Sequence, residues 1–251
     1  MNVLLRLAYD GTNYCGFQVQ PNGVSVAQVL QDAIEAVFGS RLDIKGCSRT
    51  DAGVHALAFA LNFSTESKIP VEKIPIALNT KLPADIRVLS AREVPAEFHA
   101  RYAAHNKTYQ YRIRNSVIES PFDCRYTVRV PRPLDVDAMN AAAQSCIGQH
   151  DFTAFCAAGS SAAAHGDTVR TITDCHVTRT GDVVTISVTA DGYLYNMVRI
   201  LAGTLVEAGL GRMTAQDVAA ALAARDRTMA GPTMPAKGLF LYEVAYEEDT
   251  V

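Results

Sequence analysis

The chain has 251 residues, a length that fits one large domain or two modest ones. Because 49% of its residues are hydrophobic and 20% are charged, it carries enough apolar surface for a folded core, which excludes a wholly disordered protein. Its 23 Lys and Arg residues against 26 Asp and Glu exclude a general polycation, although nucleic-acid binding requires only a local basic patch.

The first hundred residues predict alternating strands and helices. Residues 3–9 are apolar and end at Asp10-Gly11, which is typical of a strand that runs into a turn. A helix is expected to begin after Ser25, because apolar residues then repeat every three or four positions, Gln28 completes a capping box and Gly39 provides a stop. Further elements are expected as a strand at 57–63, a short helix at 71–80 and a strand at 86–94.

The second half predicts a similar set of elements. Residues 107–114 alternate apolar and polar side chains, as a half-buried strand does, and Gly181-Asp182 predicts a tight hairpin turn. Strands are also expected at 126–130, 172–179, 182–190 and 239–246, and helices at about 137–147, 193–208 and 215–224, the last capped by Thr214 and Asp217. Residues 156–168 are of low complexity and predict a mobile loop.

These elements predict an α+β fold with two lobes, residues 1–104 and 105–251, and a cleft between them. The six cysteines, at positions 15, 47, 124, 146, 156 and 175, have no C-x-x-C spacing, so neither a zinc site nor a short disulfide scaffold is indicated. No apolar run approaches the ~20 residues that cross a bilayer, and Arg6 interrupts the short N-terminal apolar stretch. We therefore expect a cytoplasmic protein with reduced thiols and no membrane segment.

Common nucleotide and hydrolase motifs are missing from the sequence. The spacing from Gly11 to Gly16 is similar to the start of a phosphate-binding loop, but Phe17-Gln18 stands where Lys-Ser/Thr would be needed. The sequence has no H-E-x-x-H, G-x-S-x-G or dinucleotide-binding motif. Nucleotide hydrolysis, zinc proteolysis and hydride transfer are therefore not supported.

The first candidate site lies in the segment Lys45–Phe63, where a polar loop leads directly into an apolar strand. This loop carries Arg49, Asp51 and His55, an arrangement that can present one carboxylate in a cleft. The alternative is a solvated turn in which Arg49 and Asp51 form a weak surface pair. His55 is either a structural histidine or a partner of Asp51, and the Asp-x-x-x-His spacing is too sparse to indicate a metal.

The second candidate is a basic stretch, residues 99–132, that also contains four tyrosines. Positive charge for phosphates together with flat rings for bases is the composition of a surface that binds single-stranded nucleic acid. An ordinary exposed strand, with arginines outward and tyrosines inward, explains it equally well. Its seven basic residues are Arg101, Lys107, Arg112, Arg114, Arg125, Arg129 and Arg132, against the acidic Glu119 and Asp123.

The third candidate is Arg199, which stands inside an otherwise apolar helical pattern. Its side chain can extend to solvent, as basic residues on apolar helices usually do. If it is buried, it needs a carboxylate partner, and Asp51 is a natural candidate.

Taken together, these residues resemble the TruA family of tRNA pseudouridine synthases over nearly the whole chain. Two small departures are Cys47-Ser48, where the family usually has Ala-Gly, and Met234, where it usually has Ala; neither touches the acidic residue. The matching segments are, in order, residues 9–20, 49–56, 77–79, 82–83, 98–101, 107–113, 150–152, 169–172, 195–199, 230–233 and 235–239.

The resemblance implies a fold, an activity and partners. The fold would have two α+β halves, each similar to an RNA-recognition module, around a mainly antiparallel sheet with helices packed on it and a central active-site cleft. The activity would be isomerisation of uridine to pseudouridine at positions 38, 39 and 40 of the tRNA anticodon stem-loop by flipping the base, without a cofactor or metal. The enzyme would work on tRNA as a homodimer.

The resemblance also implies roles for individual residues. Asp51 corresponds to the catalytic aspartate, Arg199 to its basic partner and Tyr109 to the ring that stacks on the target uracil. Arg49 matches the arginine that helps to extrude the base. Further substrate contacts are implied for Arg101, Lys107 and Leu239.

Two other functions remain open from the residues themselves. The first is an RNA-binding module without catalytic activity that uses the 99–132 stretch; its binding would weaken steeply with salt, but the RNA would stay unchanged. The second is a metal-dependent hydrolase built on Asp51, His55 and His99, which a chelator would inactivate.

Overall fold

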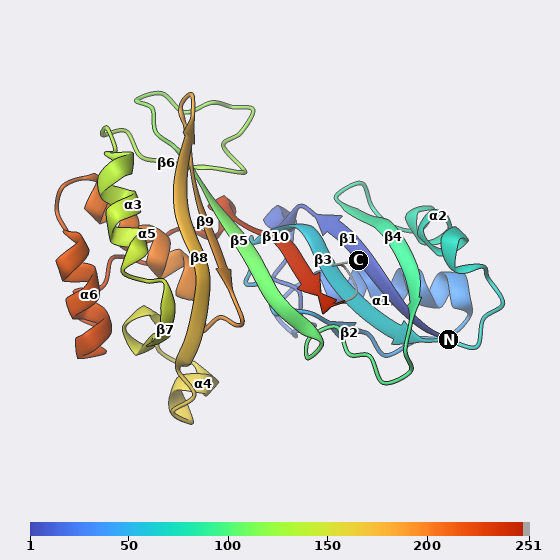
Figure 1. The fold of residues 1–251 in the computed structure, drawn as a ribbon. Helices are drawn as coiled ribbons and strands as arrows, with labels where there is room; N and C mark the ends of the chain where they lie inside the picture. Colours follow the sequence, from blue (N-terminus) through green and yellow to red (C-terminus); the bar gives the residue numbers. More distant parts are fainter. Residues whose placement is uncertain (248–251) are drawn as a thin grey trace. The chain divides into compact units, whose positions relative to one another are not determined.

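The computed structural model describes residues 1–247, which divide into two compact units (Figure 1). Unit 1 contains residues 1–105 and 240–247, and unit 2 contains residues 106–239. Both units combine mostly antiparallel strands with helices, which confirms the predicted α+β class. Among the helices within residues 1–247, none has both the length and the apolarity to span a bilayer.

The sheet of unit 1 has the strand order β4-β1-β3-β10. Strand β1 (Asn2–Tyr9) lies in the middle and pairs antiparallel with both β3 (His55–Ser64) and β4 (Ile86–Val94). Strand β10 (Leu239–Tyr246) pairs parallel with β3, with Phe240 opposite His55. The two-residue β2 (Lys45–Gly46) pairs with the far end of β3.

The helices of unit 1 follow the local signals in the sequence. Helix α1 (Val26–Phe38) begins where the Ser25 side chain accepts the N–H of Gln28, and it ends at Gly39, whose φ of 77° is left-handed. Phe38 packs edge-on against Phe63 of β3, with ring centroids 5.5 Å apart. The predicted helix at 71–80 is a 3-10 turn at Val71–Lys73 followed by α2 (Ile74–Asn79).

The sheet of unit 2 has the strand order β5-β9-β8-β7, with all neighbours antiparallel. The predicted hairpin is present, because Gly181 adopts a φ of 57° between β8 and β9. The strand expected at 126–130 is only the two-residue β6, which pairs parallel with β5. The strands are β5 (Ala104–Arg114), β6 (Val128–Arg129), β7 (Gly148–Asp151), β8 (Val169–Thr180) and β9 (Val183–Ala190).

Helices cover one face of the unit 2 sheet, as Figure 1 shows for α3, α5 and α6 beside β8. These helices are α3 (Val136–Gln144), α5 (Met197–Gly209) and α6 (Ala215–Ala224), and a short α4 (Ser161–Ala164) lies in the segment that was expected to be a loop. The predicted Thr214–Asp217 capping box is confirmed at α6. Helix α5 begins later than expected, because Asn196 takes a left-handed φ of 60° and ends the preceding turn.

Candidate functional site

The loop that carries Asp51 connects β2 to β3 and is held by the segment that follows β1. The Phe17 N–H donates to the Thr50 carbonyl at 3.1 Å, and the Gly53 N–H donates to the Tyr14 carbonyl at 3.3 Å. The Val54 N–H closes a tight turn onto the Asp51 carbonyl at 3.1 Å. The Asp51 side chain is half-buried. This loop therefore presents a half-buried carboxylate from a backbone that these hydrogen bonds hold in place.

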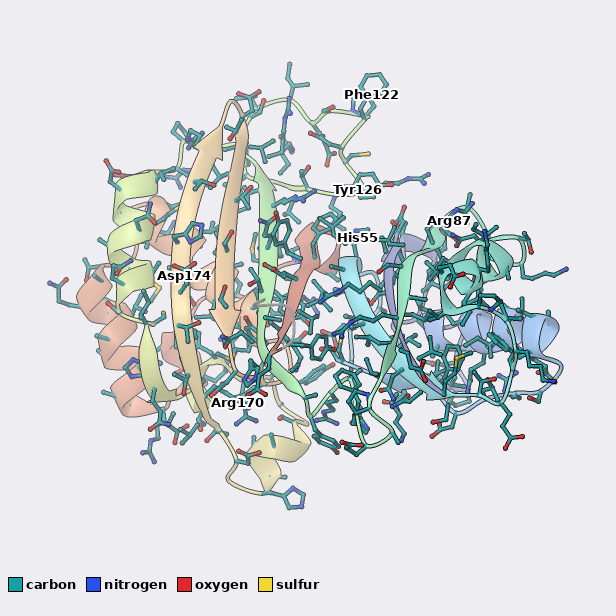
Figure 2. The ribbon with its side chains drawn as sticks, turned by 45° about the vertical axis from the view of Figure 1, so that its right-hand side comes forward. His55, Arg87, Phe122, Tyr126, Arg170 and Asp174 are labelled. Atoms are coloured by element: carbon teal, nitrogen blue, oxygen red, sulfur yellow. The ribbon has the colours of Figure 1, made fainter. Side chains whose placement is uncertain are left out.

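His55 follows this loop as the first residue of β3, where Figure 2 labels it. Its ring is buried and stacks on Phe240 with centroids 4.7 Å apart. Its Nδ1 accepts the Gly11 N–H at 3.1 Å and lies 3.1 Å from a carboxylate oxygen of Asp10. These contacts support the structural alternative for His55, which joins the chain after β1 to the start of β3. Within residues 1–247, no group of three or more His, Cys, Asp and Glu side chains lies close enough to hold a metal ion.

A cavity of about 410 Å³ in unit 1 begins at this loop. Arg49 and Arg101, which the sequence predicted as substrate contacts, both line it. His99 and Tyr102 also line it, as do Gln18 and Gln31 of α1 and the segment before it. The structure thus brings Arg49 of the Asp51 loop together with His99, Arg101 and Tyr102 of the predicted 99–132 stretch.

The turn at residues 98–101 that projects His99 and Arg101 is fixed from below by buried amides. The Asn62 side chain accepts the Ala100 N–H at 2.8 Å and donates to the Phe98 carbonyl at 3.0 Å. The Asn2 side chain also donates to the Phe98 carbonyl, at 3.1 Å. On the other side, the Tyr246 hydroxyl donates to the Ala100 carbonyl at 2.8 Å. Asn2, Asn62 and Tyr246 thus form a clamp that holds the backbone of this turn in place.

Replacing Asn62 with alanine is expected to lower the free energy of unfolding by about 2–4 kcal/mol, because it leaves the Ala100 N–H and the Asn2 carboxamide buried without this partner. Urea unfolding measures the loss. The exposed Asn22→Ala provides the control and should change the free energy by less than ~0.5 kcal/mol. A loss for Asn62→Ala no larger than that of the control would contradict the role of the clamp.

Tyr109 lies on the buried face of β5 in unit 2 and is 6% exposed. Its ring meets that of Tyr193 edge-on, with centroids 4.9 Å apart and planes at 80°. The Tyr193 hydroxyl donates to the carbonyls of Lys107 and Val188, at 2.7 and 2.8 Å, and its burial holds the Tyr193 pKa well above its usual range. Tyr193 therefore remains a neutral donor that fixes β5 around Tyr109.

Arg199 is half-buried in the first turn of α5, and its guanidinium is held in one orientation. Its Nε donates to the Met234 carbonyl at 2.7 Å, and its Nη1 donates to Oδ1 of Asn196 at 2.6 Å. Of the sequence alternatives, free extension into solvent does not fit these two bonds. The left-handed Asn196 supplies one of them, so the backbone conformation that delays α5 also orients Arg199.

The remaining predicted contacts differ in exposure. Lys107 is only 9% exposed, and Leu239, the first residue of β10, is buried. Arg114 is neutralised by Asp123 and Asp182, at 3.1 and 3.3 Å. The exposed basic side chains of the 99–132 stretch are Arg101, Arg125, Arg129 and Arg132. Phe122 points outward from the loop after β5, as Figure 2 shows.

Sequence reasoning missed a second cavity, of about 530 Å³, on the face of the unit 2 sheet opposite to the buried tyrosines. Its lining is polar and includes Arg112, Tyr126, His176 and Ser187. The signal for it was available, because polar residues alternate along both strands of the predicted hairpin at 172–190. Of the basic and aromatic residues of the 99–132 stretch, Arg112 and Tyr126 line this cavity.

Comparison with known proteins now adds to this geometry. The sequence profile of the family described as tRNA pseudouridine synthase matches residues 7–103 and 142–247. A tRNA pseudouridine synthase A of Caldicellulosiruptor saccharolyticus is 45% identical over 245 residues, which are 98% of this chain and 99% of the relative. The enzyme of that name from Halalkalibacterium halodurans is 47% identical over 236 residues (94% of this chain, 89% of the relative), and that from Clostridium acetobutylicum is 43% identical over 245 residues (98% and 99%). The chain that holds Asp51 in this anchored loop therefore belongs to the tRNA pseudouridine synthase family.

Proposed function

We propose that this protein is an isomerase that converts uridine to pseudouridine in tRNA, at positions 38, 39 and 40 of the anticodon stem-loop. The observation that carries the proposal is the family match, which extends from residue 7 to residue 103 and so includes the anchored loop with Asp51. Relatives of nearly the same length that bear the name tRNA pseudouridine synthase A support it.

The reaction breaks the N-glycosidic bond of uridine, turns the uracil and forms a carbon–carbon bond to the same sugar. A carboxylate can serve as a nucleophile or stabilise positive charge on the sugar, and it can then remove a proton as a base. We assign these functions to Asp51. The guanidinium of Arg199 is proposed as its basic partner, because a neighbouring positive charge favours the ionised carboxylate that each of these functions requires.

Tyr109 is proposed to stack on the uracil after the base leaves the helix. Stacking worth ~1–3 kcal/mol offsets part of the few kcal/mol that unstacking the base costs, and it provides a face on which the ring can turn. Arg49 would help to extrude the base, while Arg101, Lys107 and Leu239 would contact the tRNA. The fold arrangement in this proposal has two lobes with the active-site cleft between them, and two copies of the chain act on tRNA in the cytoplasm without a cofactor.

The proposal is tested by mapping pseudouridine in tRNA with carbodiimide treatment and primer extension, before and after incubation with the purified protein. New stops that report pseudouridine at positions 38, 39 and 40 are expected, each one nucleotide to the 3′ side of the modified base. Unchanged tRNA that is nevertheless bound would favour the non-catalytic RNA-binding module instead. Activity that a chelator abolishes would favour the metal-dependent hydrolase.

Lys107→Ala is expected to weaken binding to all tRNA substrates by a similar factor. It should also lower the slope of log Kd against log salt concentration by about one, which corresponds to the loss of one phosphate contact. The reason is that a lysine contact to phosphate carries no sequence information. Filter binding at several salt concentrations measures both quantities. Lys81→Ala, at an exposed position of unit 1, is the control. Weaker binding of a single tRNA sequence would contradict a phosphate contact.

A further inference from the structure

The cavity of unit 1 has the composition of a nucleotide-binding site. The roles proposed above involve only Arg49 and Arg101 among the residues that line it. Its volume of about 410 Å³ lies within the usual range of ~300–1,000 Å³ for small-ligand sites. Arg49 and Arg101 supply fixed positive charge on its wall. Ser48 and Arg49 line the cavity and belong to the same loop as Asp51, the catalytic residue proposed above.

His99 contributes a hydrogen-bond donor with a defined position. Its Nδ1 accepts the Arg101 N–H at 3.1 Å, so in the neutral ring the proton is on Nε2. Burial, together with the positive charge of Lys45, lowers the His99 pKa below its usual range, which favours that neutral ring at pH 7. Arginine, arginine and Nε2–H are all donors, and this set requires a ligand rich in acceptors, such as a phosphate with the oxygens of a base.

Tyr102 provides the flat surface that such a ligand would need. Its side chain is 77% exposed, which is unusual for a tyrosine in a folded unit. It is nevertheless held in place, because its ring centroid lies 4.4 Å from that of His99 and the Arg101 guanidinium lies over it at 5.8 Å. The buried clamp made by Asn2, Asn62 and Tyr246 fixes the turn that carries His99 and Arg101. The surface is therefore preorganised.

We propose that this cavity binds a second nucleotide of the tRNA, the one adjacent to the target uridine, with its base stacked on Tyr102 and its phosphate bound by Arg49 and Arg101. This inference rests on the proposed function. Adjacency follows from the chain, because Arg49 precedes Asp51 by two residues. A base supplies the apolar face and a phosphodiester supplies the charge, and tRNA is the substrate that offers both in one strand. Holding the neighbouring nucleotide would keep the strand open while the uracil turns.

The first test compares tRNA binding by two variants of Tyr102 in the Asp51→Asn background, where turnover does not intervene. Tyr102→Ala is expected to raise the Kd about 5- to 100-fold, because it removes the stacking surface, whereas Tyr102→Phe keeps the ring and stays within about twofold. Tyr242→Ala, a half-exposed tyrosine on β10 that does not line the cavity, is the matched control. Equal Kd values for Tyr102→Ala and the control would overturn the inference.

The second test identifies the nucleotide with anticodon stem-loops that carry an abasic residue on the 5′ or the 3′ side of the target uridine. One of the two abasic RNAs should bind wild-type protein as weakly as intact RNA binds Tyr102→Ala, and combining the abasic RNA with Tyr102→Ala should cost nothing further. Additive losses on both sides would overturn the inference.

Variants of His99 distinguish its two ring nitrogens. Nε2–H is the donor proposed to contact the RNA, and Nδ1 supports the turn by accepting the Arg101 N–H. His99→Asn keeps an acceptor for the Arg101 N–H but removes the Nε2 donor, and His99→Gln is expected to return a donor near that position. Weaker RNA binding by His99→Asn than by His99→Gln, with equal free energies of unfolding in urea, supports direct contact between the side chain and the RNA. Equal binding by the two variants contradicts it. Failure of the proposed function would be seen separately, as wild-type protein that forms no pseudouridine.

Discussion

Asp51→Asn is expected to lower the rate of pseudouridine formation by at least ~10²–10⁴-fold, while the Kd for tRNA stays within about twofold. The carboxamide has nearly the same shape as the carboxylate but is neutral, so it can neither attack nor stabilise positive charge, and it is a poor base. The loop should keep its conformation, because its anchoring bonds use backbone atoms of Thr50, Asp51 and Gly53. Single-turnover assays with tritium release from labelled uridine measure the rate.

Asp32→Asn is the matched control for this substitution. Asp32 is an exposed carboxylate of α1 that pairs with Arg41 at 2.7 Å, and exposed pairs contribute at most ~1 kcal/mol to stability. Its rate should equal that of the wild type. Normal turnover by a folded Asp51→Asn protein would refute the assignment of the reaction to Asp51. Arg199→Ala is a less specific test, because it also leaves the Met234 carbonyl without its 2.7 Å donor.

The local signals of the sequence were sufficient where a single segment determines its own structure. Ser25 and Gly39 define both ends of α1, and Thr214 with Asp217 caps α6 as expected. The start of α5 was wrong by four residues, since the left-handed backbone of Asn196 interrupts the helix before Met197 and leaves no trace in the apolar pattern. Strand β7 was missed because its four residues, Gly148–Asp151, have no apolar alternation and form a strand only through pairing with β8.

The site shows the same division between local and distant causes. The polar loop around Asp51 was visible because it interrupts apolar segments, and Arg49 and Arg101 could be proposed from the family resemblance. The clamp under the 98–101 turn was not foreseen, because a single Asn62 inside an apolar strand reads as an exposed position. Its partners lie 36 to 60 residues away in the sequence, so only the folded chain brings them together.

Gly16→Ala is expected to reduce pseudouridine formation by about 10²-fold through a shift of the Asp51 loop, without removing any catalytic group. Gly16 has a φ of +109°, and a Cβ atom there would stand 2.6 Å from the Thr50 carbonyl oxygen and 3.3 Å from the Asp51 carbonyl carbon. Both contacts are with backbone, so the loop itself must move. Because the same Thr50 carbonyl accepts the Phe17 N–H at 3.1 Å, the movement also weakens the bond that holds the loop.

Gly39→Ala distinguishes this displacement from a general loss of stability. Gly39 also has a positive φ, +77°, but nothing lies within 4 Å of its Cβ position, at the end of α1. The strained backbone should cost each variant ~1–3 kcal/mol in urea unfolding. Only Gly16→Ala should then lose single-turnover rate at temperatures where both proteins are folded, because only there does the added methyl group press on the peptide that carries Asp51. Equal rates for the two variants would mean that the position of Asp51 tolerates this shift and that the rigidity of its loop does not contribute to catalysis.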